Sequence, residues 1–172
     1  MTGSLTLRPG GPDDEEAVLD LFDRAVAWLV SQGLTDQWGD RPWTGQPRRH
    51  ALAEDWCSGG GAWFADTSSG EPAGFLGLGP ALAHVPPADV PELYVRALVT
   101  SRALPARGAG RLLLDHAFAL AADAGLGQVR VDCFAGNDGR LVAFYESCGF
   151  VRVGSFTHGG TWPGALLVRP VG

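Results

Sequence analysis

The stretch that decides the fold reads ELYVRALVTSRALPARGAGRLLLDHAFALAADA and covers residues 92–124. Glu92–Val99 is the strongest strand candidate in the chain, and the glycine pair Gly108 and Gly110 then opens a predicted helix that ends near Ala124. The two glycines remove Cβ atoms where the backbone must turn into the helix. The first amides of a helix lack intrahelical partners and point outward at the positive end of its dipole. This junction therefore predicts a site for a phosphate or pyrophosphate.

The residues around the glycine pair narrow this prediction. Arg107 adds a permanent cation whose geometry suits phosphate oxygens. A glycine pair at a helix start can also be a plain structural turn, so the motif alone leaves that alternative open. A dinucleotide-binding loop is disfavoured, because Leu113 occupies the position of its third glycine and the motif lies late in the chain.

The rest of the chain predicts alternating strands and helices without internal repeats or a long linker. The predicted strands cover residues 5–8, 62–65, 73–78, 129–133, 150–156 and 165–169. The first predicted helix starts at the acidic residues 13–16, has its apolar stripe over residues 18–29 and ends at Gly33, and two further helices cover residues 47–57 and 141–147. The second and third strands form a hairpin across a turn-rich segment. This order predicts a single α/β (α+β) domain over residues 1–172, with a mixed sheet that is antiparallel in front and has one parallel crossover behind.

Composition restricts the class of protein. A chain of 172 residues with 45% apolar residues is long enough for one domain with a real core. No stretch approaches the roughly 18 consecutive apolar residues of a membrane span, and the N-terminus shows no secretion signal. The three cysteines, Cys57, Cys133 and Cys148, are predicted to be free thiols in a reducing cytoplasm.

The net charge of −6 argues against nucleic-acid binding, which needs a broad positive field. An acidic chain mildly favours a cationic or amine-bearing substrate, although acidic composition is also common in proteins without such a substrate. A metal site is not expected, because no pair of histidines has ligand spacing.

A second motif, NDGRLVAFYESCGF, covers residues 137–150. It places an asparagine at a strand end, a tyrosine in a short helix and a Gly-Phe pair at the turn into the next strand. With the strand and glycine loop before it, this segment resembles the GNAT superfamily of N-acetyltransferases over roughly residues 90–156. The resemblance implies the acyl-CoA N-acyltransferase fold, a mixed central sheet of about six to seven strands flanked by about four helices, with acetyl-CoA wedged between two splayed strands.

The resemblance also implies roles for particular residues in binding acetyl-CoA. The pyrophosphate is expected at Arg107, Gly108, Ala109 and Gly110, largely through backbone amides. The main chain of Leu98 and Val99 is expected to hydrogen-bond the pantetheine and the acetyl carbonyl. Asn137 is expected to contact the pantetheine arm, and Tyr145 is expected to stand beside the sulfur.

The chain departs from the family pattern at two positions. The pattern Gln/Arg-x-x-Gly-x-Gly/Ala begins at Pro105, which has neither a cationic side chain nor an amide donor. We expect Arg102, Arg107 or Arg111 to supply the missing phosphate contact. The interval from Asn137 to Tyr145 is also one residue longer than is usual in the family, and the loop at Gly136 and Gly139 is expected to absorb the extra residue.

Transfer to an amine requires an acid and a base. A primary amine is only about one part in 10³ neutral at physiological pH, so its proton must be removed. Glu92 is the best-placed carboxylate, acting through water, with a solvated strand-end charge as the equal alternative and Asp132 as a second candidate base. Tyr145 is the predicted proton donor to the departing thiolate, and its alternative role is that of a packed core aromatic.

The segment between the first two helices usually borders the acceptor pocket in GNAT-like proteins. Trp38 and Trp43 are therefore predicted to form an aromatic wall for the substrate. The alternative is that they fasten a long loop to the core.

The sequence thus predicts an enzyme that moves an acetyl group from acetyl-CoA directly to an amine of a small molecule or peptide, through a ternary complex. The alternative is a non-catalytic acyl-CoA-binding module with the same fold, and a nucleotide-binding protein is the least favoured hypothesis. Homodimers are common in proteins of this type, so a homodimer is a further expectation.

Overall fold

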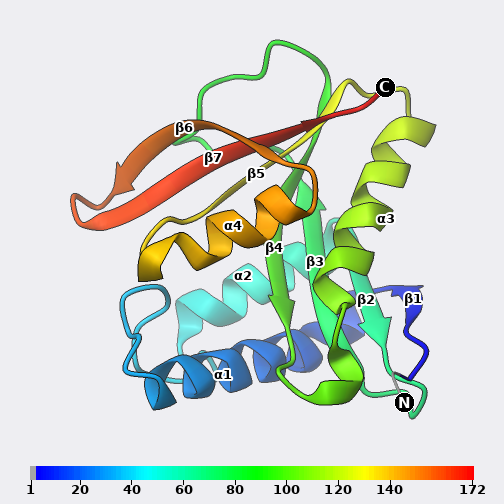
Figure 1. Ribbon diagram of the computed structural model, residues 1–172. Helices are drawn as coiled ribbons and strands as arrows, with labels where there is room; N and C mark the ends of the chain where they lie inside the picture. The colour runs from blue at the N-terminus through cyan, green and yellow to red at the C-terminus, as the bar shows by residue number, and fades with distance from the viewer. Residues whose placement is uncertain (1–2) are drawn as a thin grey trace. The chain divides into compact units, whose positions relative to one another are not determined.

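The computed structural model describes residues 3–172, and in them seven strands form one mixed sheet in the order β1-β2-β3-β4-β5-β7-β6 (Figure 1). The strands are β1 (Thr6–Pro9), β2 (Ala62–Asp66), β3 (Pro72–Gly79), β4 (Glu92–Thr100), β5 (Gln128–Phe134), β6 (Val151–His158) and β7 (Trp162–Pro170). The α-helices are α1 (Glu15–Ser31), α2 (Pro47–Ser58), α3 (Ala109–Asp123) and α4 (Arg140–Ser147). Short 3-10 turns are η1 (Pro12–Asp14), η2 (Leu104–Ala106) and η3 (Asn137–Gly139).

This arrangement confirms the predicted fold class and the predicted order of elements. The hairpin of β2 and β3 is antiparallel, and β4 and β5 are the parallel pair joined by the crossover through α3. The chain divides into two compact units, and both β4 and α3 contribute residues to each. One unit comprises Met1–Gly79 with Ala97–Leu114, and the other comprises Pro80–Arg96 with Asp115–Gly172.

The first unit is built from β1, β2, β3, α1, α2 and the end of β4. Apolar side chains at three- and four-residue spacing give α1 one buried stripe, as the sequence predicts. In Figure 1, α1 and α2 run beside each other, and their inner faces share a core with β2, β3 and β4. That core consists of Val18, Leu19, Leu21, Phe22, Ala25, Val26, Trp43, Ala53, Trp56, Cys57, Ala62, Phe64, Phe75, Ala97 and Val99.

The second unit is built on the parallel pair of β4 and β5 and the long antiparallel hairpin of β6 and β7. Within it, β5 pairs with β7 along its whole length, from Gln128↔Pro170 to Phe134↔Gly164. The helix α4 precedes β6, and its buried residues Val142 and Tyr145 face the interior of the unit. Alternation along β5 points Val129, Val131 and Cys133 to one side of the sheet and Arg130 and Asp132 to the other.

Candidate active site

The predicted site residues fall into two groups, one in each unit. The first unit carries Leu98, Val99, Arg107, Gly108, Ala109, Gly110, Arg111, Trp38 and Trp43, and the second carries Glu92, Asn137 and Tyr145. Each group is described below within its own unit.

In the first unit, the turn after β4 leads the chain into the start of α3. The Ser101 amide donates to the carbonyl of Ala73 on β3 at 2.8 Å, which holds the beginning of this turn on the sheet. The Leu112 amide donates to the Gly108 carbonyl at 3.0 Å, as in a regular α-helix. The amides of Ala109, Gly110 and Arg111 precede this bond, so they belong to the first turn, where the helix itself supplies no acceptor.

Gly108 has the conformation that a phosphate-binding helix start requires. Its φ of +89° lies in the left-handed region that favours glycine. A Cβ built on Gly108 would meet nothing within 4 Å, so the space beside this backbone is open. These residues fit the pyrophosphate of a CoA, because an anion can approach amides that point outward from the positive end of α3.

The first turn of α3 is also held tightly against the sheet. A Cβ on Gly74 of β3 would lie 3.0 Å from Leu113 Cδ1 and 3.3 Å from the Cβ of Ala109. The absence of a side chain at Gly74 therefore allows α3 to pack closely enough to fix the position of its own N-terminus.

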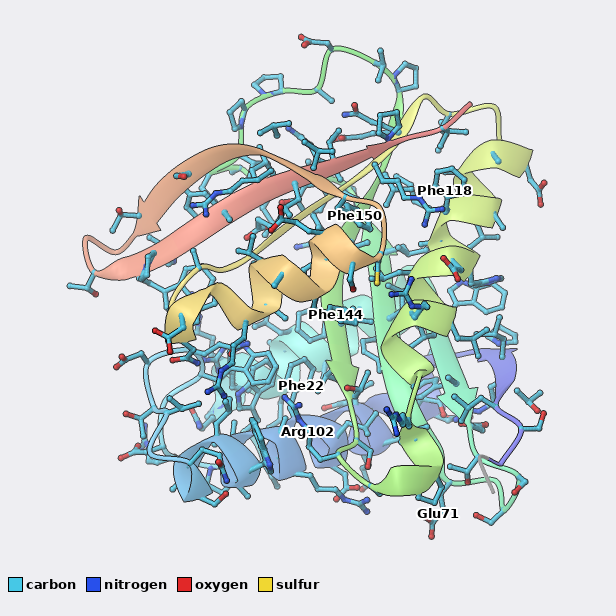
Figure 2. All side chains as sticks on the ribbon, in the orientation of Figure 1. Phe22, Glu71, Arg102, Phe118, Phe144 and Phe150 are labelled. Atoms are coloured by element: carbon cyan, nitrogen blue, oxygen red, sulfur yellow. The ribbon has the colours of Figure 1, made fainter. Side chains whose placement is uncertain are left out.

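Three arginines surround this helix start, and they differ in their surroundings. All three are exposed, but only Arg102 has a described aromatic contact. The Arg102 guanidinium lies 3.9 Å from the ring centroid of Trp28 on α1, and burial lowers the pKa of Arg102 (Figure 2). Because Arg102 stacks on an aromatic ring, Arg107 is a better candidate than Arg102 for the cation that Pro105 lacks.

Leu98 and Val99 lie near the end of β4. The described register pairs β4 with β5 from Glu92↔Gln128 to Val95↔Val131, and β4 then continues to Thr100. Val99 is buried in the core of the first unit and Leu98 is half-buried.

In the second unit, Tyr145 is buried among aromatic rings on α4 and after it. Its ring makes edge contacts with Phe144 and Phe150 at centroid distances of 5.4 and 5.6 Å (Figure 2 labels both phenylalanines). Burial raises the pKa of Tyr145 well above 10, and the neighbouring Cys133, Asp132 and Cys148 act in the same direction. The phenol is therefore protonated throughout the physiological pH range.

Asn137 opens a short left-handed turn before α4. Asn137, Asp138 and Gly139 have φ values of +54°, +60° and +72°, and the Gly139 amide donates to the Gly136 carbonyl at 3.1 Å. This turn leads directly into α4, which begins at Arg140.

Glu92, the predicted base, is engaged in a buried ion pair at the start of β4. The Arg130 guanidinium donates from Nη2 to Glu92 Oε1 at 2.8 Å, its Nε lies 2.8 Å from Oε2 as part of the ion pair, and Gln128 Nε2 donates to Oε2 at 3.0 Å. The Arg130 and Glu92 side chains are only 5% and 12% exposed. Both carboxylate oxygens thus already accept hydrogen bonds, which reduces the capacity of Glu92 to take a proton from a substrate.

A second polar cluster in this unit consists of Tyr94, Asp132 and His84, and it was not predicted from the sequence. The Tyr94 hydroxyl donates a short hydrogen bond to Asp132 Oδ1, and His84 Nε2 lies 3.5 Å from Asp132 Oδ2. Asp132 pairs with Leu166 within the ladder of β5 and β7. In the sequence, the polar side of β5 is indicated only by the alternation of Arg130 and Asp132 with apolar residues. No sequence pattern indicates that His84, in the connection before β4, lies near Asp132.

The predicted aromatic wall lies in the first unit. Trp43 is 2% exposed and stacks on Phe22 with ring centroids 3.8 Å apart. Asp23 Oδ1 accepts from the Trp43 amide at 2.6 Å, so Trp43 serves the core of this unit. Trp38 is half-buried and meets Phe22 and Trp43 edge-on, which leaves part of its ring at the surface.

All three cysteines are free, as predicted, and all three are buried. Burial raises the pKa of Cys133 to about 12 and that of Cys57 to about 11, which disfavours the thiolate that a nucleophile requires. Among residues 3–172 no group of three or more His, Cys, Asp and Glu side chains could hold a metal ion. Over the same residues, no helix has the length and apolar character needed to cross a membrane.

Sequence comparison assigns this chain to a family. The model of the Acetyltransferase (GNAT) family matches residues 28–150, which is more than half of the 172 residues. The chain therefore belongs to the GNAT acetyltransferase family, and it is an acyltransferase. A search of curated protein sequences found no match.

Solved acetyltransferases share the fold at low sequence identity. A GNAT-family acetyltransferase from Listeria monocytogenes has a TM-score of 0.70 at 22% identity, with 99% of each chain covered. The ribosomal-protein-alanine N-acetyltransferase from Brucella melitensis has a TM-score of 0.68 at 18% identity, covering 96% of this chain and 99% of that chain. A Salmonella typhimurium protein, described as an acetyltransferase and solved with its cofactor acetyl-CoA, has a TM-score of 0.63 at 16% identity, covering 98% and 94%.

Proposed function

We propose that this acyltransferase moves the acetyl group of acetyl-CoA directly to an amine of a small molecule or peptide, within a ternary complex. The observation that carries the proposal is the open helix start at Gly108, with its positive φ and outward-facing first turn, in a chain of the GNAT family. The Brucella relative acts on an alanine of a ribosomal protein, which supports a peptide amine as one class of acceptor.

The pyrophosphate of acetyl-CoA is proposed to bind the amides of Gly108, Ala109 and Gly110, with Arg107 and Arg111 as the cations. The Salmonella protein with bound acetyl-CoA supports the choice of co-substrate. Leu98 and Val99 are proposed to bind the pantetheine arm through their main chain, since they follow the part of β4 that is paired with β5 in the described register. Asn137 is proposed to contact the same arm.

Tyr145 is proposed as the proton donor to the departing sulfur. Acetyl-CoA supplies the thioester carbon that the amine attacks. A buried phenol with a raised pKa is a weak acid, but the same surroundings raise the pKa of the Cys133 thiol to about 12. Burial thus raises the pKa of a thiol as well as that of the phenol, so a thiolate formed beside Tyr145 is a stronger base than it is in water.

Glu92 is proposed as one candidate base, acting through water. Its ion pair with Arg130 and the hydrogen bond from Gln128 keep the carboxylate in place. To take a proton, Glu92 would need a lone pair that the Arg130 guanidinium does not already engage.

Trp38 and Trp43 are proposed to border the acceptor pocket, with different roles. Trp38 retains an exposed part of its ring and is the proposed contact surface, whereas the buried Trp43 holds Trp38 by an edge contact at 6.1 Å. The three buried free thiols support a cytoplasmic location, where cysteines stay reduced.

The test is steady-state release of free thiol from acetyl-CoA with a panel of primary amines, comparing the wild type with Tyr145→Phe. We expect amine-dependent thiol release, lowered about 10²-fold in kcat by Tyr145→Phe with an unchanged Kd for acetyl-CoA. Phe144→Leu is the matched control, because it alters packing beside Tyr145 without removing a hydroxyl. Tight acetyl-CoA binding without turnover on any amine would instead support the non-catalytic module.

A further inference from the structure

A histidine, an aspartate and a tyrosine form a connected polar chain in the second unit. Tyr94 on β4 is 1% exposed and donates to Asp132 on β5, and Asp132 faces Nε2 of His84 at 3.5 Å. The His84 side chain is 33% exposed, whereas that of Asp132 is 13% exposed. The chain therefore runs from a buried phenol to an imidazole that solvent or a substrate can reach.

We propose that His84 is the catalytic base that takes the proton from the acceptor amine, with Asp132 and Tyr94 as its positioning residues. This inference rests on the proposed acetyl transfer and identifies a proton acceptor other than Glu92. Two carboxylates of this unit are thus assigned different tasks: Glu92 holds Arg130, and Asp132 holds His84.

The geometry assigns the two ring nitrogens different roles. Asp132 Oδ2 faces Nε2, so a neutral His84 places its hydrogen on Nε2 and its lone pair on Nδ1. Asp132 also stabilises the imidazolium that forms when Nδ1 takes a proton. The Tyr94 hydroxyl occupies the other carboxylate oxygen, which fixes the carboxylate toward His84.

The surroundings of His84 come from three strands. From β6, the rings of Phe156 and His158 lie at centroid distances of 5.0 and 5.4 Å from the His84 ring. On β5, the Asp132 carboxylate faces His84. On β4, Tyr94 donates a hydrogen bond to the same carboxylate. The Arg130 guanidinium lies 5.5 Å from the Tyr94 ring, but its charge is paired with Glu92. His158 is the second histidine in this cluster.

The proton balance of the transfer is complete with this assignment. His84 Nδ1 takes one proton from the ammonium group and later releases it to solvent. The nitrogen–carbon bond then forms as the carbon–sulfur bond breaks, and Tyr145 donates a proton to the sulfur. The nitrogen then loses a second proton, which reprotonates Tyr145. One proton is therefore released to solvent for each amine acetylated.

The test is the pH dependence of kcat/KM for amine-dependent thiol release, measured for wild type, His84→Gln, Asp132→Asn and Glu92→Gln. We expect an acidic limb in the wild type that His84→Gln removes, together with a loss of about 10²-fold in kcat/KM at neutral pH. The Kd for acetyl-CoA should not change. Asp132→Asn should shift the limb to lower pH, because the charged form of the imidazole then loses its counter-ion.

A second readout does not depend on turnover. In a ¹⁵N-labelled protein without substrate, the Nδ1 and Nε2 shifts of His84 should report the Nε2–H tautomer, and Asp132→Asn should change the tautomer ratio. The control is His50→Gln, because His50 in the first unit also faces a carboxylate, with Nδ1 at 3.4 Å from Glu15 Oε1. This variant should keep the acidic limb.

The outcomes separate the two proposals. A wild type that acetylates amines while His84→Gln keeps both the rate and the acidic limb overturns the role of His84 alone. If Glu92→Gln removes the limb instead, the proton acceptor is Glu92. A wild type that binds acetyl-CoA but acetylates no amine overturns the proposed function and, with it, the role of His84.

Discussion

Tyr145 and Tyr94 are both buried, but they differ in the groups that surround the hydroxyl. Tyr145 lies among rings and thiols, and its raised pKa follows first from burial. The pKa of Tyr94 is also raised, first by burial and then by its hydrogen bond to Asp132, which the hydroxyl can make only while it keeps its proton. One phenol is thus available as an acid, and the other is fixed as a structural donor.

The raised pKa values predict how the protein responds to alkali. The chain contains two tyrosines, and both bind a proton more tightly in the folded state than in the unfolded chain, where tyrosine titrates near pH 10. Their contribution to stability is present below about pH 10 and is lost as the pH rises above it, because only the unfolded chain can then ionise. Ultraviolet titration should therefore show tyrosinate absorbance only together with loss of the far-ultraviolet circular dichroism of the native state.

The control for this titration is the same protein in denaturant, which should titrate both tyrosines near pH 10. Appearance of one tyrosinate near pH 10 in a still-native protein would contradict the burial described for Tyr94 and Tyr145.

Among the secondary-structure elements, α3 is the one whose start carries the binding proposal. Its N-terminus is fixed from two sides, by the bond from Ser101 to Ala73 and by the close packing of Leu113 on Gly74. Gly108 precedes it with a φ of +89°. A rigid helix start with outward amides can bind an anion without paying for reorganisation.

Replacing Gly108 is expected to affect both the stability of the fold and the binding of acetyl-CoA, and the two effects can be measured separately. Gly108→Ala forces a side chain into the left-handed region and should lower the free energy of unfolding by about 1–2 kcal/mol. It should also raise the Kd for acetyl-CoA about tenfold, equivalent to ~1.4 kcal/mol, because the Cβ enters the open space beside the helix amides. Urea unfolding and calorimetric titration with acetyl-CoA measure the two quantities.

Gly33 offers a matched control at the end of α1. Its φ is +72°, and a Cβ there would also meet nothing within 4 Å. Gly33→Ala should therefore cost a similar free energy of unfolding and leave the Kd for acetyl-CoA unchanged. Equal loss of affinity in both variants would show that the effect of Gly108→Ala is general destabilisation.

The elements could be predicted from the sequence because their signals are local. The stripe of α1 recurs at helical spacing, and the glycine pair before α3 marks the helix start directly. The side-chain pairings could not be predicted, since they join residues far apart in the sequence. Glu92 meets Arg130 and Tyr94 meets Asp132 only because β4 and β5 pair in a particular register.

The tryptophans illustrate the same limit for the whole chain. Trp38 and Trp43 have the same residue type and lie in the same loop, yet one is half-buried and the other stacks on Phe22 inside a core. Composition predicts that a core exists, and periodicity predicts which side of a helix packs against that core. Neither predicts which of two loop tryptophans fills it, because that depends on Asp23 holding the Trp43 amide from another element.

The central claim is that this GNAT-family chain transfers acetyl directly to an amine, and a single-turnover experiment tests it most directly. Enzyme with acetyl-CoA labelled in the acetyl group is mixed with the panel of primary amines, and the label is followed by mass spectrometry in the amine, the protein and the remaining acetyl-CoA. We predict that the label passes to the amine nitrogen of at least one acceptor and that none is found on Cys57, Cys133 or Cys148. Label that stays in acetyl-CoA with every amine, or that accumulates on a cysteine, would contradict direct transfer.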